Sequence, residues 1–286
     1  MRFRFILNLF LFIVVVGLAL FLFNSKNNGE TKKEVLLTNV KPETIDTIKI
    51  TRPSGEILFK KENGKWFMQS PYHLLANPAR ISAMLGLLGK QSYTQLNIKD
   101  IEPERFKLDK PAVSIQFNKL LINFGDSSPL NKDQRYVMVN DTVHLIADNL
   151  YPQLQTTATF FLNNALLEPG SEITAITFPD YTLKRQDSVW KLEPEAGMTG
   201  DDIIRMVEAW KKLEAISVRP YNNNKPSGTI KIEMKNHDPL EFAIVSPPPQ
   251  LILARPELGI QYHISGFDTK LLFPEDKPAS DKPGND

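Results

Sequence analysis

The chain carries one pattern of apolar and polar positions twice. The first copy predicts three short strands and then an amphipathic helix, at residues 45–50, 56–61, 65–69 and 78–90. The second copy predicts the same series at residues 173–178, 182–185, 189–192 and 201–213. In both copies the third strand carries a Trp, Trp66 or Trp190, and a Pro follows that strand. Because the two Trp residues hold equivalent positions, we expect each to be the packing centre of its copy.

Both copies continue with four more predicted strands. In the first copy they lie at residues 112–117, 120–124, 135–139 and 142–146. In the second copy they lie at residues 229–234, 240–245, 251–254 and 261–264. Residues 150–167, between the copies, predict a further helix. The dipeptide Asn63-Gly64 predicts a two-residue hairpin, because both central positions of a type I′ turn need a positive φ.

These patterns predict an α+β fold. An N-terminal single transmembrane helix precedes two duplicated, mainly antiparallel β units, each with a packed amphipathic helix. The chain divides into a cytoplasmic N-terminus with its anchor, a tether, two repeats and a tail, at residues 1–23, 24–43, 44–170, 171–272 and 273–286. The tail is predicted to be disordered, because it is rich in Pro, Asp and Lys and lacks apolar residues that could pack.

The prediction of an anchor rests on residues 5–23, an apolar run without a charged side chain. Such a run is long enough to cross the hydrocarbon core of a bilayer as a helix. Arg2 and Arg4 precede it, which places the N-terminus in the cytoplasm. The run is longer than the apolar part of a typical signal peptide, and no small-residue cleavage site follows. We predict an uncleaved anchor in the inner membrane with a periplasmic body; the alternative is a cleaved signal peptide.

Composition removes several classes of function. The chain has 34 basic and 33 acidic residues, so its net charge of +1 gives no basic excess for binding nucleic acid. Cysteine is absent, which excludes disulfides, thiolate metal sites and a Cys nucleophile. No Gly-x-Ser-x-Gly motif is present, so a serine hydrolase has no support.

Several of these motifs together resemble a bacterial family, the domain of unknown function numbered four-three-four-zero. The motifs are Ile45-x-x-Ile48-x-Ile50, Gly64-Lys65-Trp66, Pro71 with the helix after it, Phe124-Gly125, Tyr136-Val137 and the block Phe106-Lys107-Leu108-Asp109-Lys110-Pro111. That block is similar to the family's F-G-L-D-x-P signature, with Lys107 where glycine is usual. The resemblance implies a single-pass, envelope-facing protein, and some such proteins occur beside ABC-type transport or gliding-auxiliary components. It implies no catalytic residue.

The candidate residues for chemistry do not form a recognised motif. His73, His144, His237 and His263 lack metal-ligand spacing, so we predict no metal site and no cofactor. His144 and His263 hold equivalent positions, which favours a shared structural role. Asp201-Asp202 could act as an acid–base pair, but at the start of a helix they suit capping. Trp66 and Trp190 could stack on a glycan; core packing is the preferred interpretation.

Three functional hypotheses follow. The leading one is a membrane-tethered periplasmic accessory or scaffold protein that binds envelope or ABC-type transporter components without catalysis. The second is a periplasmic enzyme with a site in the cleft between the repeats, drawing on residues such as Asp201, His237 and His263. The third is a glycan- or lipid-binding module in the same cleft. Residues 101–111 have no counterpart in the second copy, which makes them a candidate for contact with a partner.

Overall fold

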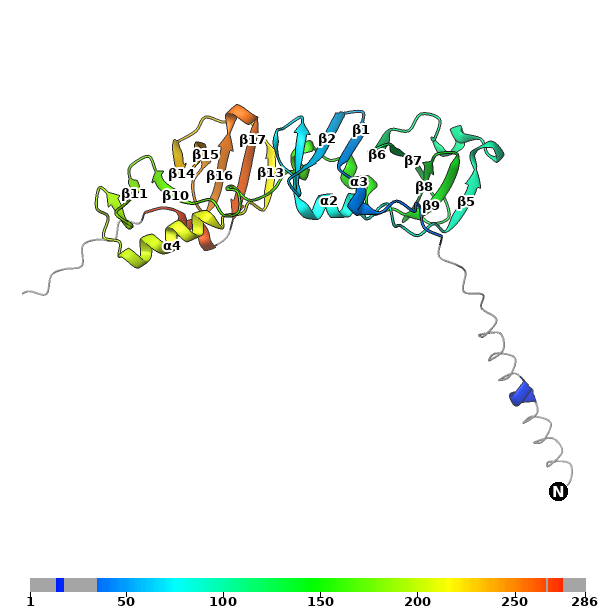
Figure 1. Cartoon of the computed structure of the whole chain (residues 1–286), viewed down its shortest axis with the longest axis horizontal. Coiled ribbons are helices and arrows are strands. Elements are labelled where there is room, and N and C mark those ends of the chain that lie inside the picture. The colour runs from blue at the N-terminus through cyan, green and yellow to red at the C-terminus, as the bar shows by residue number, and fades with distance from the viewer. Residues whose placement is uncertain (1–13, 18–34, 266, 275–286) are drawn as a thin grey trace, which may run out of the picture.

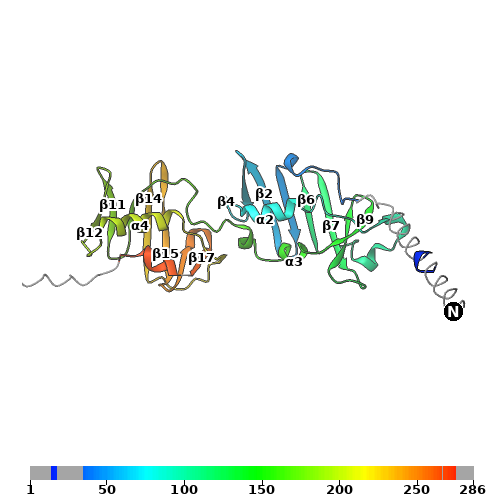
Figure 2. The same ribbon diagram turned by 90° about the horizontal axis from the view of Figure 1, so that it is seen from below.

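The computed structural model describes residues 14–17, 35–265 and 267–274, and within these residues the body consists of two antiparallel β-sheets. Figures 1 and 2 show the sheets side by side along the long axis of the molecule, with β12 at one end and β9 at the other. The first half of the body therefore forms one sheet and the second half forms the other.

The first sheet has nine strands in the spatial order β4-β3-β2-β1-β6-β7-β8-β9-β5. Their bounds are β1 (Thr47–Arg52), β2 (Gly55–Glu62), β3 (Lys65–Ser70), β4 (Leu74–Leu75), β5 (Thr94–Asn97), β6 (Val113–Phe117), β7 (Leu120–Ser127), β8 (Gln134–Val139) and β9 (Thr142–Ala147). Alternating residues point to opposite faces, as in β6, where Val113, Ile115 and Phe117 are buried. Asn63 and Gly64 have φ values of 49° and 81°, as a two-residue turn with positive φ requires.

The second sheet has eight strands in the order β12-β11-β10-β14-β15-β16-β17-β13. Their bounds are β10 (Ile173–Thr177), β11 (Thr182–Gln186), β12 (Val189–Glu193), β13 (Ser217–Pro220), β14 (Gly228–Met234), β15 (His237–Ser246), β16 (Gln250–Arg255) and β17 (Ile260–Ser265). If β4 is set aside, both sheets have the same connectivity, strand for strand. Two strands of the first sheet were not predicted, β4 and β5, and β13 was missed in the second, because each has at most four residues at or near a sheet edge.

The expected α+β class, with an N-terminal transmembrane helix and helix-packed units, is wrong. The described body is mostly sheet, and its helices are short: α2 (Pro78–Leu85), α3 (Tyr151–Leu154) and α4 (Gly200–Lys211), with 3-10 helices η1 (Pro42–Thr44), η2 (Ile98–Asp100), η3 (Pro103–Phe106), η4 (Ala158–Phe161), η5 (Pro256–Leu258) and η6 (Phe267–Leu272); residues 14–17, outside the body, are also helical. Among the described residues no helix has the length and apolar character to cross a membrane. The predicted span, residues 5–23, lies outside the described residues apart from 14–17, and so does the predicted tail beyond residue 274.

The predicted helix over residues 150–167 is also wrong, since only α3 and η4 form there. Thr156 Oγ1 donates to the carbonyl oxygen of Gln153 at 2.7 Å, and the hydroxyls of Thr157 and Thr159 lie 3.0 Å apart. Such local bonds offer the backbone an alternative to the helix. The segment after η4 is extended and leads into the second sheet.

An extended segment at the start of each unit pairs with the chain that follows its main helix. In the second unit Ala215 N donates to Asn164 O at 2.8 Å, and Leu166 N donates to Leu213 O at 3.1 Å. These bonds bring the extended segment at residues 164–166 against residues 213–215, just before β13. The hydrophobic pattern had not marked this segment, because it is short and lies ahead of the alternating strands.

The first unit repeats this arrangement. Ser92 N donates to Val35 O at 2.7 Å, and Leu37 N donates to Lys90 O at 2.7 Å. The isolated bridge Leu36–Gln91 corresponds to the bridge between residues 165 and 214. The structural unit thus includes a lead segment, residues 35–37 in the first copy and 164–166 in the second.

The chain between the units joins the two sheets. Asn163 N donates to Leu75 O at 2.9 Å, and Asn77 N donates to Phe161 O at 2.8 Å. Residues 161–163 therefore lie along the outer side of β4, and the lead segment of the second unit continues directly from them. The β4 edge of the first sheet is in this way the surface that holds the second unit.

The two Trp residues expected at the packing centres are only partly buried. Trp66 and Trp190 pack at the margin of the core. The fully buried indole belongs to Trp210 on α4, whose Nε1 donates to the carbonyl oxygen of Leu272 at 2.8 Å. Trp210 therefore ties η6 to α4, and the expectation for Trp66 and Trp190 is corrected.

Candidate functional site

The equivalent His residues form local structural contacts. His144 on β9 is buried, its Nδ1 lies 3.0 Å from Ser92 Oγ, and burial lowers its pKa. His263 on β17 has its Nε2 2.7 Å from Gln261 Nε2, and burial, aided by the charge of Arg219, lowers its pKa. These contacts hold each imidazole against a side chain of its own unit. No cluster of metal-ligand type occurs among the described residues.

Asp202, the second residue of the Asp pair, takes part in a helix cap. Thr199 is the N-cap of α4: Asp202 N donates to its Oγ1 at 3.2 Å, and Thr199 N donates to Asp202 Oδ2 at 3.0 Å. This reciprocal capping box satisfies two backbone donors at the helix start. Asp201 is exposed in the same turn. His237, at the β14–β15 turn, and His263 belong to other elements, so the expected acid–base set is spread over three elements.

The block of residues 101–111 is fastened to the first sheet. The ring of Phe106 meets that of Tyr136 edge to face at 4.7 Å, and Lys107 Nζ lies 3.0 Å from Asp126 Oδ1. Lys107 has a φ of 54°, the left-handed conformation that explains why glycine is usual there. A Cβ on Gly125 would lie 2.3 Å from Phe106 O, so only a glycine at this position lets the block pack this closely against β7. These contacts give the block a structural role against β7 and β8.

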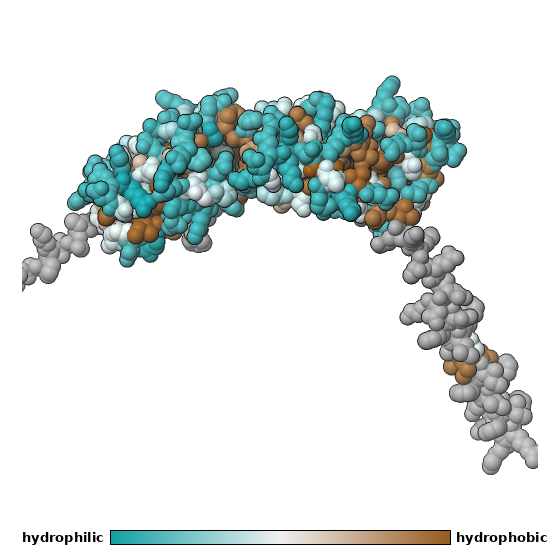
Figure 3. All heavy atoms as spheres, in the orientation of Figure 1, coloured by the Kyte–Doolittle hydropathy of each residue, from teal (hydrophilic) through white to brown (hydrophobic). Residues whose placement is uncertain are grey.

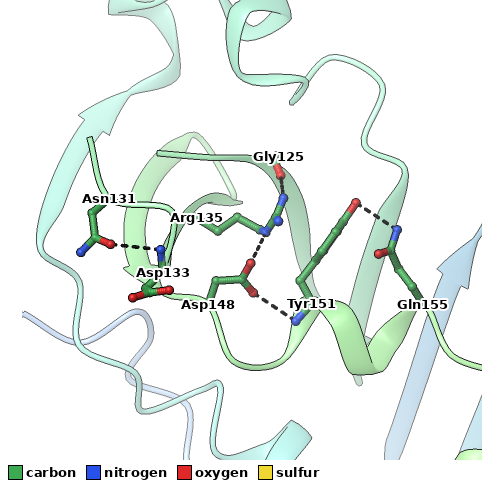
Figure 4. A network of polar contacts seen from close by, with 7 residues as sticks. All are labelled: Gly125, Asn131, Asp133, Arg135, Asp148, Tyr151 and Gln155. Carbon is green, nitrogen blue, oxygen red and sulfur yellow. Dashed lines mark hydrogen bonds and ion pairs between the residues drawn. The ribbon is translucent and has the colours of Figure 1, made fainter. Parts of the chain in front are cut away.

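A buried ion pair lies under this region (Figure 4). Arg135 Nε donates to Asp148 Oδ2 at 2.7 Å, and its guanidinium also donates to Gly125 O and stacks on the ring of Tyr151 at 3.6 Å. Tyr151 N donates to the other carboxylate oxygen, Asp148 Oδ1, at 3.2 Å. Both charges are largely removed from water, and each has several partners. The arrangement fixes the β7–β8–α3 corner, and both charged groups of the pair are engaged in it.

The cleft between the repeats is a small apolar groove of about 130 Å³. Leu74 and Leu75 of β4 form one side, and Leu240 with Tyr262 forms the other. Burial raises the pKa of the Tyr262 phenol. Glu168 is the one carboxylate in the described lining, which does not match the set of carboxylates and His that an enzyme in this cleft would need. The groove belongs to the junction that joins the units.

The outer edge of β12 is where the second unit differs from the first. β12 ends the strand order of its sheet, so within the described chain no strand pairs with its outer side. Beside it lies a hollow of about 440 Å³, which is lined by apolar residues (Trp190, Leu192, Ala196, Met198 and Ile203) and by charged ones (Lys191, Glu193 and Glu195). Val189, on the opposite face of the strand, is 61% exposed. Figure 3 shows a mostly hydrophilic surface with separate apolar patches, one of them over the region of α4.

This edge is a difference between the copies that sequence reasoning missed. In the first unit the chain after Pro71 forms β4, which pairs with β3. In the second unit the chain from Pro194 to Met198 forms no strand. The signal was present in the alignment of the copies: Leu74-Leu75 has no matching apolar pair before Thr199.

The fold defines the class as a duplicated antiparallel β protein in which the Trp-bearing strand is covered by another strand in the first unit and ends the sheet in the second. The chain belongs to the family described as domain of unknown function (DUF4340), whose profile matches residues 66–228, more than half of the chain. This match agrees with the resemblance noted in the sequence. Comparisons with curated proteins and with solved structures gave no match.

Proposed function

We propose that this chain is a membrane-tethered accessory protein of the bacterial envelope that binds other envelope or transporter proteins and catalyses no reaction. The observation that carries the proposal is the unpaired outer edge of β12 beside the Trp190 hollow. Unpaired edges are templates for pairing with another chain, and soluble proteins usually protect them. The first unit of this chain covers the equivalent edge, whereas the second leaves it open.

The proposed location rests on the sequence. Residues 5–23 are apolar, and Arg2 and Arg4 precede them, which favours a body on the periplasmic side of the inner membrane. Figure 2 places β12 at the end of the body opposite β9, and the lead segment at residues 35–37 lies with the first unit. The open edge of β12 and the lead segment at residues 35–37 therefore belong to different units, and β12 lies at the end of the body away from the first unit.

Site-directed photo-crosslinking in intact cells tests the proposal. A photo-reactive amino acid in place of Val189 should give crosslinked products with envelope proteins. The matched control is Leu130, which is 97% exposed in the β7–β8 loop of the other sheet. Equal crosslinking from both positions, or none from Val189, would contradict the proposal. A label at Asp286 that reacts only from the cytoplasmic side would contradict the location.

A further inference from the structure

We infer that the partner adds a short apolar strand, antiparallel, to the outer edge of β12, in the place that β4 takes on β3. This inference deepens the proposed function and rests on it. The partner would form main-chain hydrogen bonds to the edge and place an apolar side chain in the hollow beside Trp190.

The two edges have the same register. A two-residue turn joins β2 to β3 and β11 to β12, and Trp66 and Trp190 are each the second residue after their turn. The turn residues Asp187 and Ser188 have φ values of 46° and 69°, which match the positive values in the first hairpin. In such a hairpin the pair that flanks the turn is hydrogen-bonded, so the backbone groups of the next residue point outward.

The first unit shows how these outward groups are used. Ala76 N donates to Trp66 O at 2.8 Å, and β4 pairs antiparallel with β3 through Phe67–Leu75 and Met68–Leu74. In the second unit the backbone groups of Trp190 hold the position of those of Trp66. An incoming strand would therefore meet a carbonyl oxygen and an N–H already aligned for a ladder, at little cost in ordering the edge.

The hollow beside the edge would receive side chains from that strand. Trp190 and Leu192 point to the face of β12 that carries the hollow, since residues two apart share a face. Both are apolar, and Met198 and Ile203 line the same hollow together with Glu195. Alternate side chains of an added strand would lie over this face, so an apolar residue is favoured there.

The sequence of the chain favours a separate protein at this edge over a second copy of the chain or its own tail. In the first unit the two halves of the chain are joined one strand beyond the equivalent edge, at the outer side of β4, where Phe161 and Leu162 enter. In a second copy the residues at the matching places before its first lead segment are Lys32 and Lys33. Charged residues do not suit an apolar junction. The chain's own residues 275–286 contain no Leu, Ile, Val or Phe.

The test uses the full-length chain in detergent and a synthetic peptide with the sequence of residues 71–77, which includes β4. Fluorescence anisotropy should show saturable binding, with a Kd of roughly 1 mM or tighter. A peptide with N-methyl groups on Leu74 and Ala76, whose backbone groups face β3 in the first unit, keeps the side chains but loses the main-chain donors to the edge. It should bind at least about tenfold more weakly. Equal binding of both peptides, or no binding, would overturn the inference.

Variants of the chain give a second readout. Trp190→Pro removes an outward N–H at an edge where proline is tolerated, and it should abolish peptide binding. Trp190→Ala should weaken binding through the hollow alone. The matched control Trp66→Ala should leave binding unchanged, because β4 already covers that edge. Circular dichroism verifies the folding of each variant. Peptide binding that survives Trp190→Pro would overturn the inference.

Two other outcomes would overturn it in favour of another occupant. A dimer that Trp190→Pro dissociates would show that a second copy fills the edge. Peptide binding that appears only after deletion of residues 275–286 would show that the tail covers it. Failure of the peptide together with Val189 crosslinks in cells would leave the proposed function standing and remove only this mode of contact. Peptide binding without cellular crosslinks would show that the edge accepts a strand, but it would contradict the proposed function and with it the inferred partner.

Discussion

Ala215 donates a backbone hydrogen bond of 2.8 Å to the carbonyl oxygen of Asn164, and Ser92 makes the equivalent bond of 2.7 Å to Val35. The same backbone pairing thus begins each unit, although the two lead segments share little sequence. The conservation of this bond between copies shows that the backbone pairing, more than the side chains, defines where a unit begins.

Replacing Ala215 with Pro should destabilise the second unit. The substitution removes the N–H that bonds Asn164 O and adds little side-chain volume at a buried position. A carbonyl left without its partner costs about 1–3 kcal/mol of the free energy of unfolding. Urea denaturation measures the change, with Ala215→Ser as the control that keeps the N–H. Equal stability of both variants would contradict the pairing.

Trp210 should matter more to stability than either Trp that the repeat pattern emphasised. Trp210→Phe leaves a void and removes the bond to Leu272 O, so we expect a loss of about 1–3 kcal/mol. Trp190→Phe, at a half-buried position without that bond, should cost less than about 1 kcal/mol. Thermal unfolding compares them. A larger loss for Trp190→Phe would restore the original expectation.

Breaking the buried pair of Arg135 and Asp148 should be costly. Arg135→Met leaves the carboxylate without its cation at a site mostly removed from water. Removal of one partner of a buried pair typically costs about 3–5 kcal/mol. A double-mutant cycle with Asp148→Asn should show that the double variant loses less than the sum of the single losses. Additive losses would mean that the two groups do not interact.

Gly125→Ala should disturb the block that carries the family signature. The added methyl group would clash with Phe106 O and with Leu108, which are backbone and buried side chain. We expect a loss of about 1–3 kcal/mol, in line with overpacking. Gly89→Ala is the matched control, because a Cβ there meets nothing within 4 Å. Similar unfolding midpoints for the two variants would contradict the docking of the block.

The buried His144 should make the fold sensitive to mild acid. Burial lowers its pKa below the ordinary value of 6.5, so the unfolded chain binds its proton more readily than the folded chain. Its contribution is complete above about pH 6.5 and is lost as the pH falls toward the lowered value. His144→Gln should show a shallower fall in unfolding free energy between about pH 7 and 5. An unchanged slope would contradict this effect.

The period of two in the sequence was sufficient for most strands, because each strand buries one face and exposes the other. The hairpin at Asn63-Gly64 was equally predictable, since few residue types tolerate positive φ. The helix over residues 150–167 was mispredicted, because threonine hydroxyls and the pairing of the following segment with β4 outweigh local helical spacing. Contacts between distant segments are invisible to periodicity.

The candidate site depended even more on the tertiary structure. The sequence by itself determined that two similar units exist, that the chain lacks a cysteine or metal motif, and that Trp66 and Trp190 are equivalent. Only the tertiary structure decided that β4 covers one Trp-bearing edge while β12 stays open. Strand pairing at an edge is a matter of main-chain hydrogen bonds, which residue type hardly encodes, so two similar strands acquired different surroundings.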